Sequence, residues 1–334
     1  MSRKYSPSTI LYCGLFVTFI ALVISVCVGS KAISLSTTVE AFTAFSAANT
    51  DHLLVQELRL PRTFVALCSG SALAMAGLLI QTLTRNPLAD PGLLGINAGA
   101  SLAIVASLAL FKTASVSLQM AAGFIGACVC ALLIVGVGFS GNRASIARLI
   151  IAGVAFSAVF LSISQLILTS SDLLVFEQFR HWLVGTAAGR GYDVLWPLLV
   201  ASLAGMMISL YLAPALNAFV LGQDISQALG VSLTRVSLLA LLAITLLAGG
   251  ATAAIGPIAF IGLTIPHFAR RAMGNRHHFQ LLFCALFGGV ALVITDTLGR
   301  VIASPGEVST GVMMALLGGP FFIYLVRHKR VTAL

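Results

Sequence analysis

The sequence predicts an all-α polytopic membrane protein with ten transmembrane helices, and three observations carry this prediction. The chain has 334 residues, of which 59% are hydrophobic and only 9% are charged, whereas a soluble domain carries roughly 25% charged residues. Apolar runs long enough to cross a bilayer, which takes about 20 residues, recur along the whole chain. The charged residues lie almost entirely between these runs. We therefore expect a single transmembrane domain over residues 1–334.

The apolar runs are separated by short polar segments. In chain order they predict spans near 9–29, 63–83, 93–110, 115–139, 148–169, 191–213, 233–253, 257–272, 280–302 and 309–326. The first run is longer than the apolar region of a signal peptide and lacks a clear cleavage site, so we interpret it as a retained span. The eighth is short and begins with Gly256-Pro257, which indicates a broken or re-entrant helix.

The distribution of charge predicts which side of the membrane each loop faces. Ten spans place both termini on one side, and the side richer in Lys and Arg is cytoplasmic. With cytoplasmic termini, the inner segments hold twelve of the 19 cations, and eight of the ten acidic residues lie outside. Seven cations are exceptions on this acidic outer face: Lys31, Arg59, Arg62, Lys112, Arg180, Arg190 and Arg300.

The sequence lacks the motifs of an enzyme or an ATPase. No G-x-x-x-x-G-K-[ST], H-E-x-x-H or G-x-S-x-G motif occurs, so we expect this chain to bind no ATP, metal or other cofactor itself. The basic residues are scattered singly between apolar runs, which disfavours a nucleic-acid partner. The spans contain no paired catalytic residues, which disfavours an intramembrane enzyme.

A proton-coupled secondary transporter is the alternative from a different class. Such carriers place ionisable residues within their spans, and Asp296 is the best candidate here. Arg300 follows four residues later on the same helix face, so a local ion pair is the simpler interpretation. Glu307 lies in the outer turn that follows.

Two inner loops have unusual compositions. Residues 84–95, TRNPLADPGLLG, place two prolines, Asn and Asp in a short turn. Residues 215–235 form the longest inner loop and predict a short amphipathic helix within 219–231, bounded by sharp turns at Gly222 and Gly230. This helix is either a solvated connector or a docking element for a cytoplasmic partner.

Several of these segments together resemble one family. The run 57–101 is ELRLPRTFVALCSGSALAMAGLLIQTLTRNPLADPGLLGINAGAS, and it is followed in order by LGQDISQALGV (221–231), GPIAFIGLTIPHFAR (256–270) and TDTLGRVI (295–302). They resemble the iron-siderophore and cobalamin permeases of ABC importers (the FecCD/BtuC type) over nearly the whole chain. Within that family the run 81–101 is most similar to ferric-enterobactin, or catecholate, permeases; haem, cobalamin or another siderophore is the alternative substrate.

The resemblance implies the type II ABC importer permease fold and a set of partners. A second permease subunit, either a copy or a homologue, would pair with this chain in the bacterial inner membrane. Two cytoplasmic ATPases would use ATP and Mg, and a periplasmic binding protein would deliver the ferric siderophore. The substrate path would run mainly along the fifth and tenth spans.

The resemblance also implies roles for individual residues. Arg59, Arg62 and Arg300 would dock the binding protein through carboxylates, for which arginine is suited by its bidentate geometry; anchoring of a helix end at the lipid headgroups is the alternative. We further expect Pro61 to start the second span, where its missing N–H costs nothing.

The remaining implied sites face the cytoplasm. One cytoplasmic gate would contain Asn86 and Leu88. A second would contain Ile146 and Ala147, at positions where the cobalamin permease has small hydroxyl residues. The segment 221–231 would be the coupling helix for the ATPases, with four residues carrying that role: Gly222, Asp224, Leu229 and Gly230.

Overall fold

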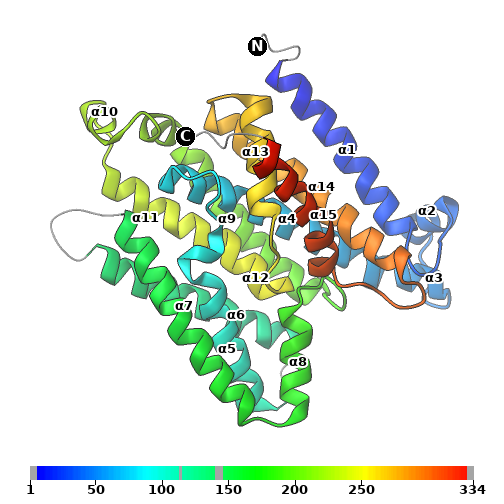
Figure 1. The fold of residues 1–334 in the computed structure, drawn as a ribbon. Coiled ribbons are helices and arrows are strands. Elements are labelled where there is room, and N and C mark those ends of the chain that lie inside the picture. Colours follow the sequence, from blue (N-terminus) through cyan, green and yellow to red (C-terminus); the bar gives the residue numbers. More distant parts are fainter. Residues whose placement is uncertain (1–5, 113–114, 140–145, 329–334) are drawn as a thin grey trace.

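The computed structural model describes residues 6–112, 115–139 and 146–328, and these are helical without any strand. Figure 1 shows a bundle of long helices joined by short connections. The α-helices are α1 (Pro7–Cys27), α2 (Leu35–Thr43), α3 (Thr50–Leu53), α4 (Leu60–Thr84), α5 (Ile96–Phe111), α6 (Val116–Gly138), α7 (Ile146–Thr169), α8 (Leu173–Leu183), α9 (Tyr192–Phe219), α10 (Gln223–Ala228), α11 (Leu233–Ile244), α12 (Gly250–Ile255), α13 (Ile261–Met273), α14 (His277–Ile302) and α15 (Thr310–His328). Two π-helical turns, η1 (Leu54–Arg59) and η3 (Thr245–Gly249), and one 3-10 turn, η2 (Pro91–Leu94), complete the order.

Within the described residues, seven helical segments are long and apolar enough to cross a membrane. They are Pro7–Cys27, Thr50–Thr84, Val116–Gly138, Ile146–Thr169, Tyr192–Phe219, Leu233–Ile255 and His277–Ile302. Two of the other expected spans coincide with the shorter apolar helices α5 and α15, and the third with α13. The chain is therefore a multi-span membrane protein.

Helix α4 forms the centre of the bundle because two of its glycines allow close helix contacts. A Cβ atom on Gly70 would lie 2.3 Å from the Gly288 carbonyl oxygen of α14, and one on Gly77 would lie 2.1 Å from that of Gly262 in α13. Small residues at such crossings are how membrane helices approach closely. As a result, 78% of the most hydrophobic stretch of the Thr50–Thr84 segment is made up of buried residues.

The expectation that Pro61 starts the second span is wrong. The helix already begins at Thr50 and runs continuously to Thr84, so Pro61 lies inside it. The π-helical turn η1 precedes the proline, and the Leu60 N–H bonds to the Val55 carbonyl, five residues back. A π-turn shifts the hydrogen-bond register where a proline lacks its donor, so the helix continues and turns Arg59 and Arg62 inward.

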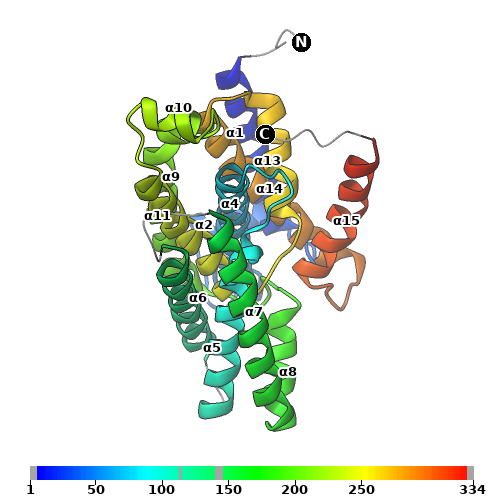
Figure 2. The ribbon, with the colours of Figure 1, turned by 60° about the vertical axis from the view of Figure 1, so that its left-hand side comes forward.

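The eighth expected span is broken at its beginning. Helix α12 ends at Ile255, and an irregular stretch precedes α13, with Gly256 at φ +84° and Phe260 at φ +69°. Figure 2 shows α15 to one side of the bundle, where it contacts α13 and α14.

The helices α2, α3 and α8 were not predicted, because each lies in a segment interpreted as a loop between spans. In Figure 1 they lie towards the right and the bottom, whereas the start of α1 and the short α10 lie towards the top and upper left. The bundle thus has two distinct ends. We refer to them as the α8 end and the α10 end.

Candidate functional site

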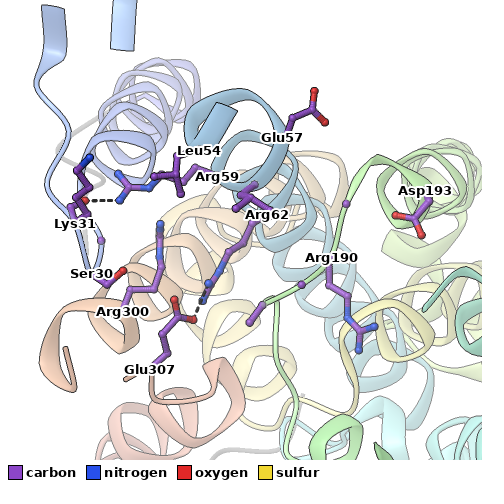
Figure 3. Close-up of a pocket in the computed structure, with 15 residues that line it drawn as sticks. Ser30, Lys31, Leu54, Glu57, Arg59, Arg62, Arg190, Asp193, Arg300 and Glu307 are labelled. Carbon is purple, nitrogen blue, oxygen red and sulfur yellow. Dashed lines mark hydrogen bonds and ion pairs between the residues drawn. The ribbon is translucent and has the colours of Figure 1, made fainter. Parts of the chain in front are cut away.

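At the α8 end, three arginines gather around one cavity. Its volume is about 520 Å³, and its walls include Arg59, Arg62 and Arg300 together with Arg190 and Glu307. We name Arg59, Arg62 and Arg300 the arginine cluster. Figure 3 shows these three side chains converging from two helical segments, with Glu307 beside Arg62. The structure therefore brings together the three residues implied as docking residues.

Arg62 is held by two carboxylates. Its Nε and Nη2 donate to the two carboxylate oxygens of Asp296, both at 2.9 Å, and its Nη1 donates to Glu307 Oε2 at 2.7 Å. The Asp296 side chain is 1% exposed, whereas that of Glu307 is 34% exposed. Arg62 therefore has one buried, bidentate partner and one partner that water and other proteins can reach.

Arg59 and Arg300 cap the end of α1. Arg59 Nη1 donates to the carbonyl oxygens of Val26 at 2.8 Å and Cys27 at 2.9 Å, and its Nη2 bonds to the Lys31 carbonyl. Arg300 Nη1 donates to the Ser25 carbonyl at 3.0 Å. The last carbonyls of a helix lack intrahelical donors, and cations are favoured there by the helix dipole.

This capping buries both arginines. Arg59 is 6% exposed and Arg300 is 3% exposed. Arg300 Nη2 also donates to Ser25 Oγ at 2.7 Å and to Thr297 Oγ1 at 3.0 Å. Of the three arginines, Arg62 is the one with a solvent-accessible carboxylate partner, so any docking contact would begin there.

The Asp296–Arg300 pair expected from sequence is present but secondary. Arg300 Nε lies 3.3 Å from Asp296 Oδ2, close enough for an ion pair but without hydrogen-bond alignment. The stronger partner of Asp296 is Arg62. The sequence could not show this, because Arg62 is 234 positions away in the chain.

Asp296 also connects the arginine cluster to the loop between α8 and α9. Thr310 Oγ1 donates to Asp296 Oδ1 at 2.9 Å and accepts from the Ala187 N–H at 3.2 Å. The loop is fixed further by bonds from Thr186 N–H to the Ile255 carbonyl at 2.7 Å and from Gly311 N–H to the Gly185 carbonyl at 2.8 Å. Residues 185–187 are therefore fixed against α12 and α15, and residues 188–191, which follow them, line the cavity.

At the α10 end, Asn86 and Leu88 lie in an exposed turn after α4. Asn86 Oδ1 accepts from the Leu88 N–H at 3.0 Å, and Leu88 is 40% exposed. Asp90 ends this turn by accepting from the Gly92 N–H at 2.8 Å. Burial raises the pKa of the Asp90 carboxyl, although the hydrogen bond from Gly92 opposes this shift.

Ile146 and Ala147, the implied second gate, form the first turn of α7. Ile146 is half-buried and Ala147 is exposed. Residues 140–145, which precede them, lie outside the described residues. A Cβ on Gly153, about two helical turns further on, would lie 2.6 Å from the Leu93 carbonyl oxygen, so α7 packs directly on the turn that follows Asn86 and Leu88.

The predicted helix over 219–231 is shorter than expected. Helix α10 contains only Gln223–Ala228, because Gly222 at φ +118° and Gly230 at φ +79° turn the chain sharply at both sides. Phe219, the first residue of the expected range, instead belongs to α9 and is 1% exposed. The exposed apolar residues of the segment are Leu221, Ile225 and Leu229, at 57%, 51% and 61%. Asp224 lies beside them and is also exposed.

Sequence reasoning missed Arg85, which connects the two inner loops. It ends α4 in a left-handed conformation at φ +49°. Its Nη2 donates to the Phe219 carbonyl at 2.8 Å, and its guanidinium lies 5.6 Å from the Phe219 ring centroid. The loop containing Asn86 is thereby attached to the segment that enters α10. In the sequence, Arg85 is a single cation directly after a long apolar run, and nothing there indicates a bond to Phe219, which lies 134 positions away.

Within the described residues, no group of three His, Cys, Asp or Glu side chains lies close enough to hold a metal ion. The features described above are instead those of a membrane permease: a multi-span helical bundle with charged side chains at one end and an exposed apolar segment at the other.

The comparisons with known proteins agree with that class. The chain matches the FecCD transport family over residues 17–328, and it belongs to that family. It is 44% identical to the ferric enterobactin transport system permease protein FepD of Escherichia coli (strain K12), over 94% of each chain. It is 37% identical to the Fe(3+) dicitrate transport system permease protein FecC of the same organism, over 83% of each chain.

More distant relatives extend the same pattern. The iron(3+)-hydroxamate import system permease protein FhuB of Bacillus subtilis (strain 168) is 33% identical over 98% of this chain and 85% of its own. Among solved structures, a metal-chelate type ABC transporter in an inward-facing conformation superposes with a TM-score of 0.86 at 26% identity, covering 96% of this chain and all of that one.

Proposed function

We propose that this chain is the permease subunit of an ATP-driven importer that moves a ferric siderophore across the bacterial inner membrane. The observation that carries the proposal is membership of the FecCD transport family over residues 17–328. The arginine cluster would face the periplasm and α10 the cytoplasm, with both chain ends cytoplasmic. The charge distribution of the loops supports that orientation.

The substrate class we propose is a ferric catecholate of the enterobactin type. The 44% identity with the ferric enterobactin permease supports it, compared with 37% for the dicitrate and 33% for the hydroxamate permease. Because these relatives carry different ligands on one fold, sequence identity ranks the substrates and does not fix one. Haem, cobalamin or another siderophore is the alternative substrate.

The partners follow from the same proposal. A second permease subunit would complete the pathway, two ABC ATPases would bind ATP and Mg²⁺, and a periplasmic binding protein would deliver the ferric complex. The resemblance to a metal-chelate type ABC transporter supports such an assembly.

The arginine cluster would receive the binding protein. Arg62 supports this role best, because its second carboxylate partner, Glu307, is partly exposed and can be exchanged for a carboxylate of the binding protein. Arg59 and Arg300, which are buried and line the same cavity, would then shape the site and add to its positive potential. Exposed pairs contribute about 0.2–1 kcal/mol each, so the contacts would mainly orient the partner and accelerate encounter.

The segment 221–231 would receive an ATPase. Three exposed leucine and isoleucine side chains on a segment of this size suit a groove in a partner, because the fold of this chain leaves them more than half exposed. The two glycine turns, with Ser226 Oγ bonded to the Ala218 carbonyl at 2.8 Å, hold α10 against the end of α9. Closure of the ATPases would thus move α9 and, through Arg85, the gate loop of Asn86 and Leu88.

The proton-coupled carrier is the less favourable function. Asp296 is buried and bonded to Arg62 and Thr310, so a proton would have to compete with a bidentate arginine for its carboxylate.

The proposed function is tested by reconstituting this chain with its partner permease, ATPase and binding protein in proteoliposomes. We expect uptake of labelled ferric tris-catecholate that requires both ATP and the binding protein. Uptake by this chain alone, driven by a pH gradient and lost in Asp296→Asn, would instead establish the carrier.

A further inference from the structure

Arg190 differs from Arg59, Arg62 and Arg300 in the partners that the described residues give its side chain. It is 6% exposed and lies in the loop between α8 and α9. In the part of the chain that the structure describes, no hydrogen bond or ion pair to its guanidinium is found, and its Nε is buried and unsatisfied. A buried guanidinium without an acceptor is costly, and a bound ligand that supplied an acceptor would remove this cost.

The side chain lies where two cavities meet. It borders the cavity of about 520 Å³ that holds the arginine cluster, and a second cavity of about 360 Å³ between the start of α6 and α8. Figure 3 shows the Arg190 guanidinium directed away from Arg62 and Glu307, which bind each other. The side chain therefore lines cavity space, and its Nε donor has no acceptor among the described residues.

Two residues that line the second cavity have polar atoms for which the described part of the chain supplies no partner. Trp182 Nε1 and Gln178 Oε1 are both buried and unsatisfied, and both residues line this cavity with Arg190. Arg190 offers an anionic, oxygen-rich ligand a charged fork and Trp182 Nε1 offers one N–H donor, while Gln178 Oε1 can accept from a hydroxyl group of the ligand. Catecholate rings present both anionic oxygens and an aromatic plane.

The loop that carries Arg190 is preorganised. Thr186 is bonded to the end of α12, Gly185 and Ala187 are bonded to the start of α15, and the Tyr192 hydroxyl donates to the Gln56 carbonyl at 2.9 Å. Asp193 is the acidic neighbour whose charge acts on Arg190, yet it forms no ion pair with it. Burial lowers the pKa of Arg190 to about 10, so the side chain stays cationic at neutral pH while being poorly solvated.

We propose that Arg190 is an anion-binding residue at the entrance of the substrate path, and that it binds a catecholate oxygen of the ferric complex when the binding protein releases it. This inference rests on the proposed function, because it assumes that the cargo is an anionic ferric chelate. A ferric ion with three catecholate groups carries three negative charges, whereas a ferric trihydroxamate is neutral. A carboxylate of the binding protein is the competing occupant, and the test distinguishes the two.

The experiment uses the complete importer in nanodiscs and proteoliposomes, with Arg190→Gln, Arg190→Lys and the control Arg180→Gln. Arg180 is an exposed arginine of α8, so its replacement removes the same charge without touching the cavity. We expect Arg190→Gln to reduce uptake of ferric tris-catecholate about tenfold, since the variant loses a charge-assisted hydrogen bond to the ligand. Arg190→Lys should recover part of the uptake, and Arg180→Gln should match the wild type.

Two further measurements locate the effect. Ferric tris-catecholate should quench the fluorescence of Trp182, identified as the signal lost in Trp182→Phe, and this quenching should vanish in Arg190→Gln. Association with the binding protein and basal ATPase activity should remain at wild-type values.

The outcomes separate the two proposals. If the wild type imports the tris-catecholate and Arg190→Gln imports it equally well, the inference about Arg190 is overturned and the substrate class stands. Arg190→Gln could also weaken association with the binding protein while ferric tris-catecholate still quenches Trp182 fluorescence. In that case the occupant is a protein carboxylate, and the inference is again overturned. If the wild-type importer does not transport the tris-catecholate, the proposed substrate class fails first.

Discussion

Arg62 and Asp296 are 234 positions apart in the chain, yet they form a bidentate ion pair with both hydrogen bonds at 2.9 Å. The pair joins α4 to α14 at the α8 end of the bundle. Through Thr310 it also fixes the loop that carries Arg190. The carboxylate that first looked like a proton carrier is therefore the organising residue of the arginine cluster.

Asp296→Asn should destabilise the protein strongly. Asparagine cannot neutralise Arg62 and Arg300, and breaking a buried ion pair costs about 3–5 kcal/mol. Thermal unfolding of the purified chain in detergent should show a clear fall in Tm, and the control Asp172→Asn should not, because Asp172 and its partner Lys112 are 73% and 76% exposed. A stable Asp296→Asn protein that had lost only proton-dependent uptake would favour the carrier instead.

Glu307→Gln should strengthen association with the binding protein by a few-fold. Its carboxylate occupies the accessible donor of Arg62 at 2.7 Å, and removing its charge frees that donor for the partner. Association rates measured over a salt series would check this, with Glu40→Gln as the control because Glu40 is exposed on α2. Weaker binding in Glu307→Gln would mean that Glu307 itself contacts the partner.

Gly77→Ala should destabilise the bundle by about 1–3 kcal/mol, because overpacking a tight contact costs that much. The added methyl group would lie 2.1 Å from the Gly262 carbonyl oxygen. Gly136→Ala is the matched control, since a Cβ there meets nothing within 4 Å. Unfolding of both variants should be compared in the same detergent, and equal Tm values would contradict the close packing of α4 on α13.

Leu229→Glu should reduce assembly with the ATPase. Leu229 is 61% exposed beside α10, and a charge there must be desolvated when the segment enters an apolar groove. Gln227→Glu adds the same charge at an exposed polar position of the helix and should have a smaller effect. Co-purification of the ATPase and ATP-coupled uptake measure the outcome; normal coupling in Leu229→Glu would mark the segment as a connector.

Asp90→Asn should stabilise the protein more at pH 7 than at pH 4. The folded-state pKa of Asp90 is raised by burial, so its contribution to stability is fully present below its unfolded value, about 3.9, and is lost as the pH rises through the folded value. Asparagine keeps the acceptor for the Gly92 N–H and carries no charge. The difference in Tm between variant and wild type should therefore grow with pH, and a difference that shrinks would contradict the burial of this carboxyl.

The membrane class, the long helices and the break before α13 follow from local features, namely apolar length and the Gly256-Pro257 pair. Sequence also singled out the three arginines, because they are cations on an otherwise acidic side. Their partners could not be predicted, since Arg62 meets Asp296 only once α4 packs on α14. The position of Pro61 was misjudged because proline at a helix start and proline after a π-turn have the same local sequence.

The burial of Arg190 could not be predicted from the sequence either. In the sequence it is one of seven outer cations, and nothing distinguishes it from Arg180. Only the folded chain reveals that Arg190 is buried without a hydrogen-bond partner among the described residues, whereas Arg180 is exposed. Burial and pairing are properties of tertiary contacts, and a single sequence does not contain them.

We infer that this chain imports a ferric siderophore with energy from ATP hydrolysis in partner subunits. The most direct measurement is uptake of labelled ferric tris-catecholate into proteoliposomes that contain the assembled importer, with the binding protein outside and ATP within reach of the ATPases. We predict uptake that needs ATP and the binding protein and that persists when a protonophore abolishes the pH gradient. Uptake without ATP that disappears on adding the protonophore would contradict the claim.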